Sequence, residues 1–267
     1  MTLRFPDVSS YQNGLRIQAG TPALIAKATQ GTTYQDPCFH DFMDQAAGVG
    51  AIRSGYHFIE QGNVPAQAAY CAAFVGDQLR SEVPMMIDCE PTGNSRPTIS
   101  DCLTFVEHYP GRVWGLYLPR WYYNQIGGDL RPLRDKGVCL ISSDYSGYTD
   151  DPSGAGWQAY GGVTPSVWQS TDHYAYGGKL VDSNAFKGDS IALHELILGD
   201  DMTPHDVWAF RGNNGDGNGP DAPDVHQSLL STRDDVAALK VHVFGDEEKQ
   251  IEGLSAKLDR IIAKIGA

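Results

Sequence analysis

Apolar residues in the first 190 positions fall into short runs of strand length, which alternate with longer segments of helical composition. Eight runs predict β-strands, at residues 3–9, 23–29, 51–58, 83–90, 113–118, 138–145, 165–170 and 179–186. Intervening segments predict helices, among them residues 36–48, 63–79, 98–108 and 120–126. Asn63 is the candidate N-cap of the second helix, and Thr98 or Ser100 that of the third. Strands that alternate with helices indicate parallel β-α-β units.

The pattern changes after Tyr145, where the connections become rich in Gly and Tyr and lose helical periodicity. Eight strands with about five helices therefore predict an α/β barrel whose later part has lost its helical layer. We expect this barrel to occupy residues 1–190.

The chain changes character again after Gly188. A short amphipathic helix is predicted over residues 189–198, and residues 212–223 are rich in Gly, Asn and Asp, a composition typical of a flexible linker. We therefore expect short helices and a linker over residues 191–223 and a helical region over residues 224–267.

The helical region contains apolar residues in 3-4-3-4 spacing, a heptad pattern formed by Ile251, Leu254, Leu258, Ile261 and Ile265. Three interpretations are open: packing on the same chain, self-association as a coiled coil, or binding to a wall or membrane surface. Acidic residues between positions 246 and 252 weaken the third interpretation. We favour a homo-oligomer that forms through this C-terminal helix.

Charge and composition exclude several partners. The chain has 20 basic and 33 acidic residues, a formal charge of −13, which disfavours binding to nucleic acid. No apolar run approaches the roughly 18 residues of a membrane span, and the N-terminal residues lack the apolar core of a signal peptide, so we expect synthesis in the cytoplasm. The five cysteines are widely spaced without a Cys-x-x-Cys motif, which favours buried free thiols.

Candidate functional residues lie in or near the last part of the predicted strands. In parallel barrels such residues gather at the carboxyl ends of the strands. The residues found there are Asp7, Tyr56, His57, Asp88, Glu90, Tyr117, Trp168, Gln169, Asp182 and Asn184. Each has an ordinary explanation when taken alone, as a turn residue or as packing. Together they predict four acids and several aromatic rings at one mouth of the barrel.

Asp88 and Glu90 are two positions apart at the end of one strand, so both point to the same face while Cys89 points away. Repulsion between the two acids raises one pKa and keeps one carboxyl protonated as a general acid. We expect Asp88 to be ionised and Glu90 to hold the proton. A carboxylate cluster without basic neighbours serves either a hard cation or acid/base chemistry on an oxygen-rich substrate. The aromatic and amide residues favour a sugar, so we predict no metal and no cofactor.

Seven motifs carry a resemblance to a known family, and they occur in the family's order. They are Asp7–Gln12, Ala26–Gly31, Gly55–Phe58, Ile87–Glu90, Gly115–Tyr117, Val167–Gln169 and Val181–Asn184. The chain resembles glycoside hydrolase family 25, the N,O-diacetylmuramidases or Chalaropsis-type lysozymes, over about residues 3–187.

The resemblance implies a (β/α)5(β)3 barrel that cleaves the β-1,4 bond between N-acetylmuramic acid and N-acetylglucosamine in peptidoglycan. It implies that Glu90 is the general acid/base and that Asp88 orients the substrate's own N-acetyl group, with Asp88 as a direct nucleophile as the alternative. Asp7 and Asp182 correspond to two supporting carboxylates. The expected substrate-binding residues are Tyr56, Tyr117, Tyr145, Trp168, Gln169 and Asn184.

The chain departs from the family pattern in three places. Gln30 stands where the second motif usually has Glu, which weakens a substrate contact or a hydrogen bond. The motif on the sixth strand lacks its Trp, and Trp157 is a candidate replacement for that stacking surface. No wall-binding repeat is recognised in the sequence after residue 188.

The family is common among phage endolysins. We therefore expect an endolysin that resides in the host cytoplasm before lysis and then reaches the cell wall. A virion-associated wall-degrading component and an inactive peptidoglycan-binding module are the alternatives, and retention of all four acids disfavours the inactive module.

Overall fold

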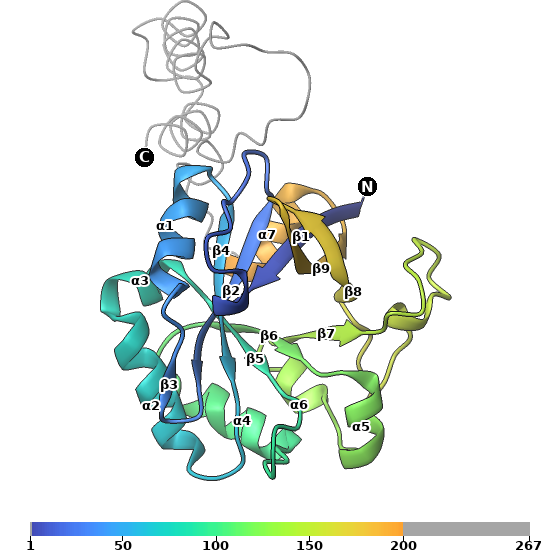
Figure 1. The fold of residues 1–267 in the computed structure, drawn as a ribbon. Helices are drawn as coiled ribbons and strands as arrows, with labels where there is room; N and C mark the ends of the chain where they lie inside the picture. Colours follow the sequence, from blue (N-terminus) through green and yellow to red (C-terminus); the bar gives the residue numbers. More distant parts are fainter. Residues whose placement is uncertain (1, 200–267) are drawn as a thin grey trace, which may run out of the picture. The chain divides into compact units, whose positions relative to one another are not determined.

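The predicted strands close into a barrel in the computed structural model, which describes residues 2–199 (Figure 1). The barrel strands are β1 (Thr2–Val8), β2 (Ala23–Gln30), β4 (Ile52–Phe58), β5 (Met85–Asp88), β6 (Val113–Tyr117), β7 (Cys139–Ser143), β8 (Val167–Tyr176) and β9 (Lys179–Lys187). The two-residue strand β3 (Tyr34–Gln35) pairs with β2. The order β1-β9-β8-β7-β6-β5-β4-β2 is closed by pairing of β2 with β1, which confirms the α/β barrel.

One barrel strand runs against the others. All neighbouring pairs among the eight barrel strands are parallel except those of β9, which is antiparallel to both β8 and β1. Gly177 and Gly178 both have positive φ in the tight turn between β8 and β9, as a two-residue hairpin requires. Asp182 therefore lies in the first half of β9 and pairs with Asp7, so its expected place at a carboxyl strand end was wrong.

The described helices are α1 (Phe39–Gly48), α2 (Val64–Val75), α3 (Asp77–Glu82), α4 (Ile99–His108), α5 (Arg120–Ile126), α6 (Arg131–Arg134) and α7 (Ser190–Leu198). Asn63 caps α2, and Thr98 forms a capping box with Asp101 at α4. Gly76 has a φ of 78°, which ends α2 and splits the single helix predicted over residues 63–79. Between β7 and β8 there is a 3₁₀ turn but no α-helix, as the loss of periodicity predicted.

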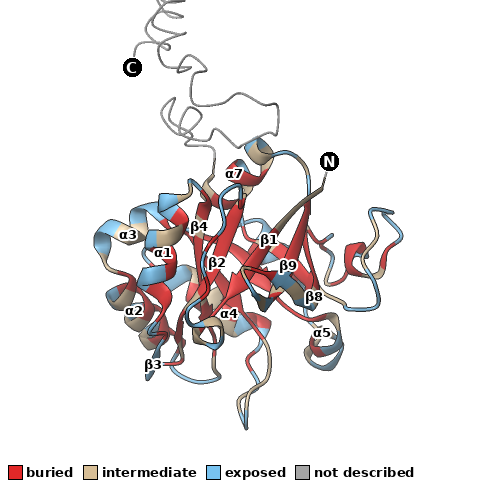
Figure 2. Ribbon diagram, turned by 45° about the horizontal axis from the view of Figure 1, so that its top comes forward, coloured by how far each residue is buried: buried red, intermediate tan, exposed pale blue. Residues whose placement is uncertain are grey.

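The core lies between the barrel and its helices. Buried aromatic rings of α1 and α4, including Phe39, Phe42 and Phe105, pack on the outer surface of the strands, while exposed positions face away (Figure 2). All four residues of β5 are buried. Because β5 is fixed between neighbouring strands and this apolar layer, Asp88 at its end is held in place.

Helix α7 is part of the barrel unit. Leu193 and Ile197 are fully buried, and the Arg112 guanidinium donates hydrogen bonds to the carbonyls of Ile197 (2.9 Å) and Leu196 (3.2 Å). The expected domain boundary at residue 190 therefore cuts through structure that packs on the barrel.

The linker predicted over residues 212–223 and the helical region predicted over residues 224–267 lie outside the described residues, so self-association through the helical region stays a prediction. No helix among residues 2–199 is long and apolar enough to cross a membrane. All five cysteines are free thiols; Cys38, Cys71, Cys89 and Cys102 are buried, and Cys139 is half-buried.

Candidate active site

The acidic residues meet in a cleft of ≈390 Å³ at the carboxyl ends of the parallel strands. Its polar and aromatic lining comprises Asp7, Ser9, Tyr11, Gln12, Lys27, Gln30, Tyr56, Phe58, Asp88, Glu90, Thr92, Tyr117, Gln169 and Asp182. All four predicted acids are therefore brought together, with Tyr56, Tyr117 and Gln169. His57 is fully buried outside the cleft, where its ring contacts Thr29 and Gln67.

Asp88 and Glu90 enter the cleft from the end of β5. Hydrogen bonds from the Ile59 amide to the Asp88 carbonyl (3.0 Å) and from the Cys89 amide to the Tyr117 carbonyl (2.9 Å) continue the strand pairing. Cys89 is fully buried on the opposite side. Asp88 Oδ1 is also buried, and it accepts no hydrogen bond from any residue in 2–199. A buried acceptor of this kind is suited to a donor brought by a substrate.

The pKa values of both carboxyls are raised. Burial raises the pKa of Asp88 well above its usual range, the charge of Glu90 raises it further, and Lys27 partly offsets both. Burial also raises the pKa of Glu90, while Lys27 lowers it and Asp7 raises it. The larger rise lies on Asp88 because it is the more buried group. In the empty cleft, burial therefore favours the protonated form of Asp88 more strongly than that of Glu90, and the expected ionisation of Asp88 beside a substrate's acetamido group stays a prediction.

Asp7 is held by donors from β8 and β9. Its Oδ2 accepts hydrogen bonds from Gln169 Nε2 (3.0 Å) and Asn184 Nδ2 (2.6 Å), and Asp182 hydrogen-bonds to the same carboxyl. Burial raises the pKa of Asp7, and these three bonds lower it. Burial and the charge of Asp7 raise the pKa of Asp182 to about 8, so Asp182 carries a proton at neutral pH and donates it toward Asp7.

Two predicted substrate-binding residues support this network instead of lining the cleft. Asn184 is 1% exposed and bonds Asp7, because Gln169 and Asn184 are paired across β8 and β9. Tyr145 is half exposed, and its hydroxyl donates to Gln169 Oε1 at 2.6 Å. Tyr145 therefore fixes the amide that holds Asp7.

Asp182→Asn is expected to reduce the pH dependence of folding stability. The folded pKa of Asp182 is about 8 against 3.8 for an ordinary Asp. Its protonated form therefore stabilises the fold fully below about pH 4, and this contribution is lost as the pH rises through about 8. Asparagine keeps a donor toward Asp7 and does not ionise. In urea unfolding at about pH 5 and pH 8, the variant should gain stability relative to wild type at the higher pH. Equal pH dependence in both proteins would contradict the proton assignment.

Lys27 is a charged residue of the cleft that sequence reasoning missed, and the expectation of a carboxylate cluster without basic neighbours was wrong. Its ammonium lies 4.8 Å from the centre of the Phe58 ring and interacts electrostatically with Asp88 and Glu90. Burial lowers its pKa, and the surrounding carboxylates raise it. A lysine inside the apolar run that forms β2 was the available signal.

Trp168 does not reach the cleft. Side chains alternate along β8, so Gln169 points inward and Trp168 outward. Trp168 is fully buried against Trp157 and the backbone of Gly156, where a Cβ would collide with the indole, and its ring nitrogen donates to the Asp144 carbonyl (2.7 Å). The prediction of direct substrate contact through Trp168 does not fit this position.

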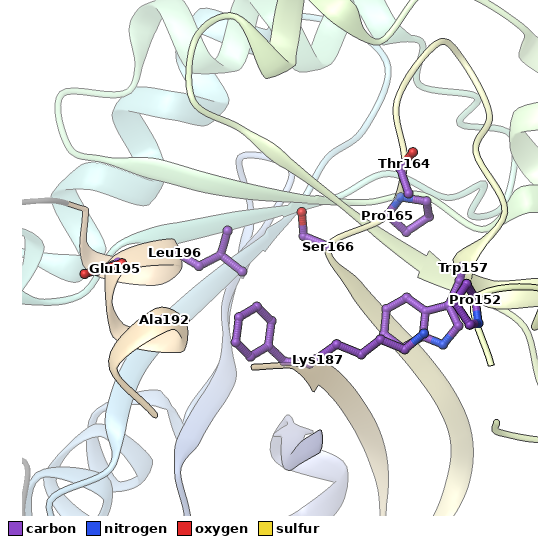
Figure 3. Close-up of a pocket in the computed structure, with 10 residues that line it drawn as sticks. Pro152, Trp157, Thr164, Pro165, Ser166, Lys187, Ala192, Glu195 and Leu196 are labelled. Carbon is purple, nitrogen blue, oxygen red and sulfur yellow. The ribbon is translucent and has the colours of Figure 1, made fainter. Parts of the chain in front are cut away.

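Trp157 also lies away from the acids. It lines a larger cavity of ≈690 Å³ beside α7, together with Pro152, Lys187 and Leu196 (Figure 3). The Lys187 ammonium lies over the Trp157 ring at 4.2 Å. This cavity adjoins the start of β8 and the end of β9, opposite the acidic cleft, so Trp157 does not replace the missing Trp of the sixth strand.

Trp168→Ala is expected to lower the free energy of unfolding by about 3–5 kcal/mol, because it empties a fully buried site. Trp121→Ala is the matched control, since Trp121 is 51% exposed, and it should cost about 1 kcal/mol or less. Urea unfolding measures both values. A small loss for Trp168→Ala would contradict a structural role.

The arrangement is suited to proton transfer on an oxygen-rich substrate. Burial raises the pKa values of Asp88 and Glu90, so both carboxyls hold a proton more readily than ordinary ones, and tyrosine rings line the walls. Burial raises the pKa values of Tyr56 and Tyr117 well above their usual range, so both hydroxyls stay neutral donors. No group of three His, Cys, Asp or Glu residues within 2–199 is arranged to hold a metal ion.

Comparison with known proteins places the chain in a family. The model of Glycosyl hydrolases family 25 matches residues 6–178. An N,O-diacetylmuramidase of Chalaropsis sp is 30% identical over 216 residues, which are 72% of this chain and 98% of that protein. The lysozyme of Streptococcus phage Cp-9 is 31% identical over 110 residues, 39% of this chain and 31% of that protein.

Solved structures agree with these sequence matches. The muramidase from Trichobolus zukalii superposes with a TM-score of 0.58 at 25% identity, over 74% of this chain and 99% of that one. The match of the family model spans more than half of the chain, and the Chalaropsis protein is matched almost in full. The chain belongs to glycosyl hydrolase family 25 and is a glycoside hydrolase.

Proposed function

We propose that this glycoside hydrolase is an N-acetylmuramidase, which hydrolyses the β-1,4 bond between N-acetylmuramic acid and N-acetylglucosamine in peptidoglycan. The observation that carries the proposal is the buried, unsatisfied Asp88 Oδ1 beside Glu90 in a cleft lined by tyrosines. An N-acetyl sugar brings the amide N–H that this oxygen lacks. The muramidases and lysozymes among the similar proteins support the choice of substrate.

Glu90 is the proposed general acid/base. It donates its proton to the glycosidic oxygen as the bond to the anomeric carbon breaks, and the aglycone leaves as an alcohol. The acetamido carbonyl oxygen attacks the same carbon and forms a cyclic oxazolinium ion. Glu90, now ionised, then removes a proton from a water molecule that attacks the anomeric carbon and opens the ring with net retention.

Asp88 is proposed to orient the acetamido group and to balance its developing charge. An N–H donated to Asp88 Oδ1 stabilises the ionised carboxylate and lowers the raised pKa of Asp88. The resulting negative charge beside Glu90 favours retention of a proton on Glu90. Substrate binding thereby lowers the pKa of Asp88, which has the larger rise in the empty cleft, relative to the pKa of Glu90.

The remaining residues of the cleft support this chemistry. Tyr56 and Tyr117 offer ring faces and neutral hydroxyls to a sugar. Asp7, with a proton-bearing Asp182 beside it, is the proposed acceptor for substrate donors at the floor, and Gln169, Asn184 and Tyr145 fix its position.

We further propose that the protein acts as a phage endolysin, which is released from the host cytoplasm onto the wall at lysis. Its similarity to the lysozymes of Streptococcus phages Cp-9 and Cp-1 supports this role. A virion-associated wall-degrading component uses the same chemistry and differs only in where the protein is carried.

The proposed bond specificity is tested by digestion of purified peptidoglycan with the full chain. The products are reduced with borohydride, and the new reducing ends are identified by mass spectrometry. Reduced muramic acid ends are expected. Reduced glucosamine ends, or released peptides without new sugar ends, would overturn the proposal. A protein that binds peptidoglycan and releases nothing would favour the inactive binding module.

A further inference from the structure

The Lys27 ammonium is the start of a short hydrogen-bonded chain that leads away from the acids. Lys27 Nζ donates to Gln30 Oε1 at 2.8 Å, and Gln30 Nε2 donates to Glu60 Oε1 at 2.9 Å. The Gln30 amide thus uses its acceptor toward a cation and its donor toward a carboxylate. Only one orientation of the amide satisfies both neighbours.

A bulge in β2 makes the hydrogen bonds from Lys27 through Gln30 to Glu60 possible. The register with β4 shifts between Lys27 and Thr29, so Lys27 pairs with Tyr56 and Thr29 with His57. Residues three apart on a regular strand point to opposite faces, whereas a bulge adds one residue and restores the same face. Lys27 and Gln30 therefore both line the cleft, and Thr29 turns outward to His57.

Glu60 is held in place at the far end of this series of hydrogen bonds. The buried amide of Gln67 clamps its backbone, with Gln67 Nε2 donating to the Glu60 carbonyl (2.6 Å) and the Glu60 amide donating to Gln67 Oε1 (2.9 Å). Gly31 has a φ of +53°, and a Cβ on it would lie 2.5 Å from Glu60 Oε2. The carboxylate of Glu60 therefore occupies space that any other residue at position 31 would fill.

The charges around Lys27 come from several elements. Asp88 and Glu90 face it from the end of β5, Asp36 from the segment after β3, and Glu60 from the loop after β4. The rings of Phe58, Tyr34 and Tyr56 lie 4.8, 5.4 and 5.8 Å from the ammonium. Glu60 is one amide away from the cation and does not pair with it directly.

We propose that Gln30 and Glu60 are positioning residues, which hold the Lys27 ammonium through a neutral amide so that its charge acts on Asp88 and Glu90. The inference rests on the proposed function and extends it to Gln30 in the wall of the cleft and to Glu60, which is bonded to Gln30. A carboxylate at position 30 would lie beside the Lys27 ammonium and neutralise its charge. In this protein the negative charge lies on Glu60, one hydrogen bond further from the Lys27 ammonium.

The test is a pair of substitutions that change charge without changing size. Gln30→Glu adds a negative charge beside Lys27 and raises the pKa values of Asp88 and Glu90. Glu60→Gln removes a negative charge and lowers both. The profile of kcat/KM against pH should therefore shift to higher pH for Gln30→Glu and to lower pH for Glu60→Gln, by about 0.5 pH unit each.

Glu107→Gln is the matched control. Glu107 is a half-exposed carboxylate on α4 that pairs with Lys136, so this variant should leave the profile in place. Thermal unfolding checks that all variants fold. A purely structural role for Gln30 or Glu60 would lower stability without moving the two profiles in opposite directions.

Titration of ¹³C-labelled Asp and Glu carboxyls by NMR reads the same pKa shifts without catalysis. Opposite shifts of the Asp88 and Glu90 signals in the two variants are expected. Unmoved signals, or shifts of the same sign in Gln30→Glu and Glu60→Gln, would overturn the inference. Failure of the wild type to release muramic acid ends would overturn the proposed function instead, and the NMR titration would still decide the role of Gln30 and Glu60.

Discussion

Glu90→Gln is expected to lower kcat on peptidoglycan by about 10²–10⁴-fold, the usual contribution of a general acid/base. The amide keeps the size of the side chain but has no proton to give to the glycosidic oxygen. Mass spectrometry of borohydride-reduced products measures the rate at which muramic acid ends appear. Binding of the variant to insoluble peptidoglycan should persist, because the walls of the cleft are unchanged.

Two controls separate loss of chemistry from loss of fold. Glu107→Gln, on the outer face of α4, should cleave at the wild-type rate. Thermal unfolding of Glu90→Gln should occur no lower than that of wild type, because the substitution removes a partly buried carboxyl with a raised pKa. Activity above about a tenth of wild type would contradict the role of Glu90.

Asp88→Asn is expected to lower kcat by about 10²–10³-fold, the loss typical when one group that stabilises the transition state is removed. The amide has no negative charge to balance the developing oxazolinium ion. Rates of reducing-end release measure the effect. Asp135→Asn, which removes an exposed carboxylate after α6, is the matched control and should keep full activity.

Trapping of a glycosyl ester on the wild-type protein distinguishes the two mechanisms. A fluorinated glycoside that slows breakdown of a glycosyl ester would leave a mass adduct on Asp88 if that residue were the nucleophile. The assisted mechanism predicts no adduct on wild type. The stability of Asp88→Asn should also rise relative to wild type as the pH increases, because the raised pKa of Asp88 penalises its ionised form.

The strands could be predicted because barrel strands are buried on both faces. Met85–Asp88 is buried at every position, which produces a continuous apolar run in the sequence. The pairing of Asp88 with Glu90 followed from alternation along an extended chain. Both predictions depend on local geometry, which can be inferred from a single sequence.

The missed features depend on information that is not local. Alternation separates Trp168 from Gln169 but does not say which one faces the lumen. The bulge in β2 reverses the expected faces after Lys27, so the chain from Lys27 to Glu60 could not be inferred from spacing. The order of the two pKa values at Asp88 and Glu90 depends on burial, which only the folded structure defines. The direction of β9 did have a signal, since Gly177-Gly178 between two strand-like runs is typical of a hairpin.

The attachment of α7 has a practical consequence for shortened or chimeric enzymes. Arg112 precedes β6, so its bonds to the last carbonyls of α7 lie at the end of the barrel remote from the acids. A truncation at residue 187 would remove a helix that covers buried surface, whereas one after Gly199 would retain it. A new wall-binding module joined after Gly199 would leave from the side opposite the cleft, where its linker need not cross the path of a glycan strand.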